Sequence, residues 1–203
     1  MMSKTLRRWE AALLAAVSMV LCIMTWAQSR QSSISAGLVR LHVVAASDDG
    51  LEQAIKLRVR DAVLAYLNES LLHAGTAAEA KSILSADLNG IAQAAASAAA
   101  GREVAVTLGR EYFPTREYEG MTLPAGSYES LRIVLGAGKG HNWWCVVFPP
   151  LCLSAAEGDR MESVMSRDDF AIITEAEGYE LRFKAVELWG RLVSGLHGSR
   201  SGA

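Results

Sequence analysis

Two runs of β-forming residues between Tyr128 and Leu153 constrain the fold more than any other part of the sequence. The runs Tyr128–Leu135 and Asn142–Phe148 flank a glycine-rich loop at residues 136–140, and a Pro-Pro pair follows the second run. Two such runs joined by a short loop with glycine are typical of a β-hairpin, and proline ends a strand because it has no N–H to donate. We therefore expect an antiparallel hairpin in which the two runs pair with each other.

The register of this hairpin predicts which side chains share a face. With residues 136–140 as the loop, the more apolar face carries Leu131, Ile133, Trp143 and Cys145, and the second face carries Arg132 and Trp144. An exposed cation–π contact between Arg132 and Trp144 would contribute about 0.5–1 kcal/mol. Two interpretations of the second tryptophan stay open: a ring buried in the core, or an anchor at an interface with a partner.

The remaining patterns predict an α+β fold. Strands are expected at Leu38–Ala46, Glu103–Leu108 and Glu111–Glu119, and helices at Leu51–His73, Ala77–Ala100 and Glu180–Leu196. In the first of these helices, Glu52, Lys56 and Arg60 recur every four residues, which indicates a solvent-exposed face. We expect a mostly antiparallel sheet with two long helices and a C-terminal helix packed on it, preceded by an N-terminal signal or anchor segment.

The N-terminus has the pattern of an export segment. Lys4, Arg7 and Arg8 precede the apolar run Ala11–Ala27, and this order of charge keeps the N-terminus cytoplasmic while the remainder is exported. As a helix the run would be about 26 Å long, against a hydrocarbon core of ~30 Å. A cleaved signal peptide and a retained membrane anchor both stay open. The predicted organisation is signal peptide or anchor at 1–27, linker at 28–37, one exported α+β domain at 38–197 and a disordered tail at 198–203.

Composition and motifs argue against several classes of function. The net charge is −2 and the basic residues form no patch or stripe, so we expect no nucleic-acid partner. No Ser or Thr follows the lysine of loop 136–140, which predicts a flexible turn instead of a phosphate-binding loop. His141, Cys145 and Cys152 lack a fourth ligand for zinc. We therefore expect neither a metal nor a cofactor.

Cys145 and Cys152 are expected to form a disulfide, because an exported domain lies in an oxidising compartment. Two buried free thiols are the alternative. An envelope hydrolase using Cys145 as nucleophile and His141 as base is an alternative function. Residues four apart on a strand are separated by about 13 Å, however, and the chain carries no known catalytic motif. We expect no enzymatic activity; a structural envelope domain is a further alternative.

Several motifs together resemble the stage II sporulation protein R family of endospore-forming bacteria. They are Arg40-Leu-His-Val-Val-Ala45 with Ser47-Asp48, Lys56-Leu-Arg-Val-Arg-Asp-Ala-Val63, Tyr128-Glu-Ser-Leu-Arg-Ile133, His141-Asn-Trp-Trp-Cys-Val146 and Phe148-Pro-Pro-Leu-Cys152. The resemblance runs from Leu38 to Leu153 and departs at Ala46, where the family usually has asparagine. The motif residues singled out are Arg40, His42, Ser47, Asp48, Arg60, Asp61 and Trp143.

The resemblance implies a messenger and not a catalyst. Proteins of this family are exported from the forespore into the space between the forespore and mother-cell membranes. There they activate a membrane-embedded aspartic peptidase that removes the pro-sequence of sigma factor E. We therefore expect an exported signalling protein with that peptidase as its partner, and with membrane contact through residues 9–27 if these are not cleaved. The candidate partner-binding residues are Arg132, His141, Asn142 and Trp144.

Overall fold

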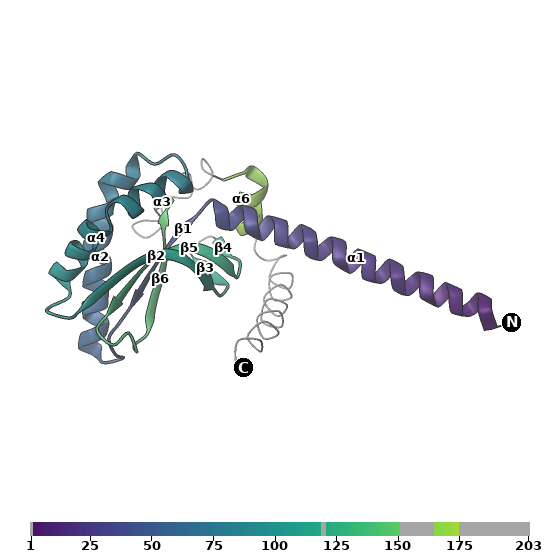
Figure 1. Cartoon of the computed structure of the whole chain (residues 1–203), viewed down its shortest axis with the longest axis horizontal. Helices are drawn as coiled ribbons and strands as arrows, with labels where there is room; N and C mark the ends of the chain where they lie inside the picture. Colours follow the sequence, from purple (N-terminus) through teal and green to yellow (C-terminus); the bar gives the residue numbers. More distant parts are fainter. Residues whose placement is uncertain (1, 119–120, 151–164, 175–203) are drawn as a thin grey trace, which may run out of the picture.

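The structure is a computed structural model that describes residues 2–118, 121–150 and 165–174 (Figure 1). In chain order its elements are α1 (Met2–Ala36), β1 (Val39–Val44), α2 (Gly50–Leu72), α3 (Ala77–Ala86), α4 (Leu88–Ala98), β2 (Val104–Phe113), β3 (Arg116–Tyr118), β4 (Met121–Leu123), β5 (Gly126–Leu135), β6 (Asn142–Phe148) and α6 (Arg167–Thr174). Helices pack on a mixed sheet, so the predicted α+β class is confirmed.

The main sheet has the strand order β2-β5-β1-β6, which places β1 in its interior. β1 pairs with β5 in parallel and with β6 in antiparallel orientation, and β2 pairs with β5 in antiparallel orientation. The predicted hairpin is therefore wrong, because β5 and β6 are consecutive strands that lie on opposite sides of β1. β3 and β4 form a small sheet of their own.

The loop 136–141 connects β5 to β6 across the end of β1. Gly140 N donates to Ala45 O at 3.0 Å, and Lys139 N donates to Ala46 O at 3.2 Å. Strands on either side of a third strand lie about 9.6 Å apart, which a two-residue hairpin turn cannot span. The loop is thus a hydrogen-bonded bridge over β1 and not the flexible turn expected from its glycines.

The predicted division of side chains between the two faces is confirmed despite the wrong pairing. Val43 of β1 lies between Ile133 of β5 and Trp143 of β6, and all three pack in the core cluster beneath α2, α3 and α4. The insertion of β1 preserves the alternation of side chains, so these residues keep their predicted faces. Phe148, which the hairpin register places opposite Tyr128 on the second face, packs in the helix-side core instead, because a bulge shifts the register of β6 against β1 between Val146 and Phe148. The end of α1, β4 and α6 pack against the opposite face (Figure 1).

Three charged residues of α2, Glu52, Lys56 and Arg60, face protein and not solvent. Lys56 is only 5% exposed, Glu52 accepts a hydrogen bond from Arg102 at 2.6 Å, and Arg60 lies 4.3 Å from the centre of a Trp143 ring. The predicted solvent-exposed face is therefore wrong. The physical reason is that β6 and loop 136–141 lie against this side of α2 and contact Arg60 and Lys56. Arg102, which follows α4, pairs with Glu52.

Two other element boundaries differ from the prediction. The long helix expected at Ala77–Ala100 is two helices, because the Asp87 side chain accepts from Gly90 N at 3.2 Å and caps a new helix, α4. The strand expected at Glu111–Glu119 is divided. β2 continues as far as Phe113, and Pro114, which has no N–H, separates it from β3.

The N-terminal helix α1 is continuous through residues 28–36, where a linker was expected. Its apolar part has the length and composition to cross a membrane, as either a signal peptide or an anchor would. Its last turns belong to the folded domain: Ile34 is fully buried, Ser33 Oγ donates to Asp169 at 2.6 Å, and Arg30 pairs with Asp168 at 3.1 Å. The apolar segment and the domain are therefore joined by a helix without a break.

Some predictions concern residues outside the described part of the chain. These are the cysteine at position 152, the helix expected at Glu180–Leu196 and the tail at 198–203. They stay predictions, as does the division of the chain into domains.

Candidate functional site

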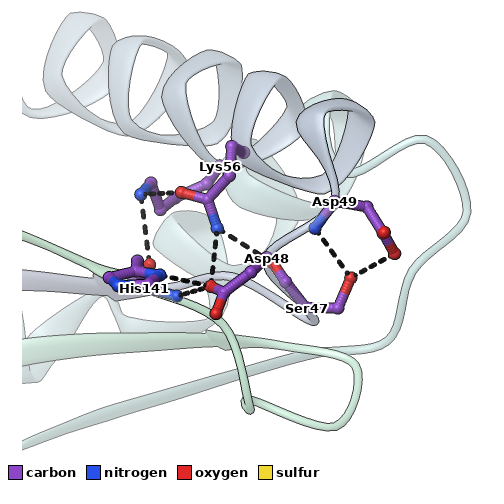
Figure 2. A network of polar contacts seen from close by, with 6 residues as sticks. Ser47, Asp48, Asp49, Lys56 and His141 are labelled. Atoms are coloured by element: carbon purple, nitrogen blue, oxygen red, sulfur yellow. Dashed lines mark hydrogen bonds and ion pairs between the residues drawn. The ribbon is translucent and has the colours of Figure 1, made fainter.

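Asp48 and His141 join two segments that are far apart in the chain (Figure 2). Asp48 Oδ1 accepts the His141 backbone N–H at 2.6 Å and lies 2.5 Å from His141 Nδ1. The bond from the His141 ring lowers the pKa of Asp48, and the bond from the backbone N–H adds to this effect. Beside Asp48, Ser47 Oγ donates to the Asp49 carboxylate at 2.6 Å. The turn after β1 is therefore fixed to loop 136–141 by a charged carboxylate.

Lys56 and Gln53 support this contact from α2 (Figure 2). Lys56 Nζ donates to His141 O at 3.1 Å and to Gln53 Oε1 at 2.5 Å. Gln53 Nε2 in turn donates to Ser47 O at 2.8 Å. Burial lowers the pKa of Lys56, and the nearby negative charge of Asp48 opposes this shift. The network therefore holds three separate pieces of the chain in one arrangement.

An open groove of about 530 Å³ lies beside this network and is lined by Asp48, Arg116, Lys139, Gly140, His141, Asn142 and Trp144. The groove residues come from the turn after β1, from β3, from loop 136–141 and from β6. Three of the four candidate partner-binding residues, His141, Asn142 and Trp144, thus line one surface with a motif residue, Asp48. The fourth candidate, Arg132, does not line the groove.

Trp144 is held from behind by His42 of β1. Their rings stack with centres 3.9 Å apart and planes 13° apart, and His42 Nδ1 lies 3.1 Å from Glu111 Oε2. The predicted contact between Arg132 and Trp144 is wrong, because His42 lies between them in the sheet. Arg132 pairs with Glu111 at 3.3 Å instead. The Trp144 ring therefore lines the groove in an orientation that its stacking on His42 fixes.

Arg40 is enclosed on the same face of the sheet. It is 0% exposed, its guanidinium lies 4.2 Å from the centre of the Phe113 ring and 5.1 Å from that of Tyr128, and Nη2 donates to the Tyr118 hydroxyl. Among the residues that the structure describes, Nε and Nη1 have no hydrogen-bond partner and no carboxylate pairs with Arg40. Burial lowers the pKa of Arg40 and raises the pKa of Tyr118 and of Tyr128. We call Arg40 with these three rings the aromatic cage.

The other motif residues lie on the helix-covered face or against it. Arg60 stacks over Trp143, which packs against the helix-side core, and also pairs with Asp61 at 2.7 Å. These residues are well placed to fix α2 on β6. The structure therefore divides the motif residues into one group at the groove and the aromatic cage and a second group at the contact between α2 and β6.

Cys145 faces the helices as well and carries no sign of catalysis. It is 4% exposed and disulfide-bonded, and a disulfide sulfur is not a thiolate nucleophile. Because residue 152 lies outside the described residues, the Cys145–Cys152 pairing stays a prediction. Over the part of the chain that the structure describes, no group of three His, Cys, Asp or Glu side chains could hold a metal ion.

Comparison with known proteins identifies the family. A family model described as stage II sporulation protein R matches residues 35–158. The chain belongs to the stage II sporulation protein R family. It is 35% identical over 136 residues to stage II sporulation protein R of Bacillus subtilis (strain 168). That alignment covers 64% of this chain and 59% of the relative's length. No solved structure matches.

The stage II sporulation protein R match, at residues 35–158, includes every residue of the groove and of the aromatic cage. The family therefore supports a role in sporulation for the part of the chain that carries both. Most of α1 precedes the match.

Sequence reasoning missed three groove residues of this family member. Arg116 and Lys139 gave no signal, because their positions depend on the separate β3 strand and on the path of loop 136–141. Gly140 did give a signal, because glycine is common where one backbone approaches another closely, and it directly precedes the motif residue His141. Lys56 supports the groove from α2, although its helical spacing alone predicts a solvent-exposed position.

The Asp48–His141 contact predicts a dependence on acid. The pKa of Asp48 is lowered in the folded protein. The contact therefore stabilises the fold at pH values above the ordinary aspartate pKa of about 3.9, and this stabilisation is lost as the pH falls through the lowered pKa. We expect the NMR shift of the His141 amide proton to titrate in this acidic range. Asp48→Asn should abolish that titration, whereas Asp61→Asn, at an exposed carboxylate on α2, should not. A His141 amide titration that persists in Asp48→Asn would contradict this assignment.

Proposed function

We propose that this protein is an exported sporulation signal that switches on the membrane peptidase responsible for processing pro-sigma factor E. In this proposal the groove is the surface that the peptidase contacts. The protein itself performs no chemistry; it acts by binding, on the outer side of the membrane from which it was exported.

One observation carries the proposal: motif residues from opposite ends of the matched region meet in one groove. Asp48 follows the first strand of the sheet and His141 precedes its last, yet the two are in direct contact. A network of this kind orders the exposed side chains around it and so lowers the entropic cost of binding. Trp144, backed by His42, adds an aromatic side chain of the type that dominates binding energy at interfaces.

The N-terminal helix supports export. It has the composition of a signal peptide or membrane anchor and leads directly into the domain. The family supports the sporulation context. The disulfide of Cys145 is in keeping with an oxidising compartment and disfavours the alternative of a cysteine hydrolase.

The test is a processing assay in which this chain is produced together with the peptidase and pro-sigma factor E of the same organism in a non-sporulating host. Asn142→Arg places a bulky cation in the groove at an exposed position, so it should leave the fold intact while blocking the peptidase. We expect the processed fraction of pro-sigma factor E, measured by immunoblot, to fall at least about tenfold, as a loss of about 1.4 kcal/mol in binding would produce.

Arg132→Ala is the matched control. Arg132 lies in the same sheet and is exposed like Asn142, but it does not line the groove. Processing should stay within about twofold of the unsubstituted chain, since Glu111 keeps its contacts with His42 and Ser130 and a partly exposed ion pair contributes little. Circular dichroism of both variants establishes that they are folded. Full processing with folded Asn142→Arg would remove the groove from the interface.

A further inference from the structure

The negative charge of the groove has partners within the described residues, whereas its two exposed positive charges form no ion pair there. The carboxylate of Asp48 is bound by His141 and lies near Lys56. Arg116 and Lys139 are exposed, and among the described residues neither forms an ion pair with a carboxylate. Arg116 lies 5.9 Å from the centre of the Trp144 ring. The groove therefore offers two cations to a ligand, while its own anion is already occupied.

The groove also borders the edge of the main sheet. β6 has β1 on one side and, among the strands that the structure describes, none on the other. The first residues of β6, Asn142 and Trp144, line the groove. An exposed strand edge presents backbone N–H and C=O groups to which an extended peptide can add as a further strand. Within the described residues, Asn142–Trp144 forms such an edge, and it lies beside Arg116 and Lys139, which no described carboxylate pairs with.

We propose that the groove takes an extended, acidic peptide segment of the partner protein, which adds to the edge of β6 at Asn142–Trp144 and places its carboxylates on Arg116 and Lys139. This inference deepens the proposed function and rests on it, since it names the chemistry of the segment that the peptidase presents. Side chains at alternate positions of an added strand point to the same face. An acidic residue at every second position therefore matches a groove whose cations lie on one side of the sheet.

The probe is a rhodamine-labelled octapeptide, Glu-Val repeated four times, titrated against the full chain in zwitterionic detergent micelles by fluorescence anisotropy. We expect binding that weakens with added salt and no binding of the matched Lys-Val peptide. The double variant Arg116→Glu with Lys139→Glu should raise the dissociation constant of the acidic peptide at least about tenfold, because two attractive charge interactions become repulsive. The control, Arg58→Glu with Arg110→Glu, has the same net charge but lies outside the groove and should change the dissociation constant less than about twofold.

Backbone pairing is tested with two further peptides of unchanged charge, N-methylated either at the four valines or at the four glutamates. Only alternate N–H groups of an added strand face β6, so one of these peptides should lose binding and the other should keep it. Equal binding by both, or equal loss in the control and groove variants, would overturn the inference.

The outcomes separate this inference from the proposed function. If Asn142→Arg blocks processing but the groove double variant binds the acidic peptide unchanged, the acidic-strand inference is wrong and the proposed function stands. If the full chain binds phosphatidylglycerol vesicles through Arg116 and Lys139 but not the peptide, the cations serve a lipid surface, and the inference is also wrong.

Discussion

Arg40→Ala is expected to lower the free energy of unfolding by about 2–4 kcal/mol, as for other large buried side chains reduced to alanine. The substitution empties the aromatic cage formed by Phe113, Tyr118 and Tyr128 and removes the donor to the Tyr118 hydroxyl. Because the cage lies on the same face of the sheet as His42, we expect the stacking behind Trp144 to loosen as well. Urea unfolding followed by circular dichroism measures the change.

Arg40→Met is the informative partner of this variant. Methionine fills the cage with a chain of similar length and removes a buried charge that no described carboxylate neutralises. Replacing a buried charge with a well-packed apolar side chain is often neutral or stabilising. We therefore expect the free energy of unfolding of Arg40→Met to lie within about 1 kcal/mol of that of the unsubstituted chain. This variant should also support processing of pro-sigma factor E. A loss as large as that of Arg40→Ala would mean that the positive charge itself stabilises the fold.

Gly140→Ala is expected to abolish signalling through a clash between two backbones. A Cβ at Gly140 would overlap Ser47 O and lie 2.5 Å from Ser47 C, so the loop 136–141 and the turn after β1 would have to separate. That movement breaks the bond from Gly140 N to Ala45 O and displaces His141 from Asp48. We expect the processed fraction of pro-sigma factor E to fall at least about tenfold and stability to fall by about 1–3 kcal/mol, the usual cost of overpacking.

Gly109→Ala is the matched control for this effect. Gly109 lies in β2, an edge strand, and a Cβ there would meet no atom within 4 Å. Its substitution should leave both processing and the unfolding midpoint essentially unchanged. Unimpaired processing with Gly140→Ala would show that the groove tolerates a displaced His141.

The faces of the sheet could be predicted from sequence, but its strand order could not. Alternation of side chains is local, so Trp143 and Trp144 had to point to opposite faces whatever their neighbours were. Strand pairing depends on distant segments. A glycine-rich loop of this length fits a hairpin or a bridge over a third strand, and only the hydrogen bonds from Gly140 and Lys139 to the end of β1 distinguish them.

The sequence of β1 did contain a signal that local reasoning overlooked. Strand residues 39–44 are buried on both faces, as is typical of an interior strand, and the run Val39–Val44 is apolar except for Arg40 and His42. Those two side chains could have indicated either a solvent face or a buried polar layer. The rings that enclose them come from β2, β3, β5 and β6, so no single segment of sequence identifies the cage.

The interior position of β1 has a consequence for how the chain reaches its native state. β1 precedes α2, α3, α4 and β2 in the chain, yet its two neighbours, β5 and β6, follow all of them. Pairings between such distant segments form slowly, because a long loop must close before they contribute free energy. During synthesis the described sheet cannot close until residue 148 has been made, because β6 ends there. The topology itself therefore delays folding until most of the described domain has been made, which suits the export proposed above.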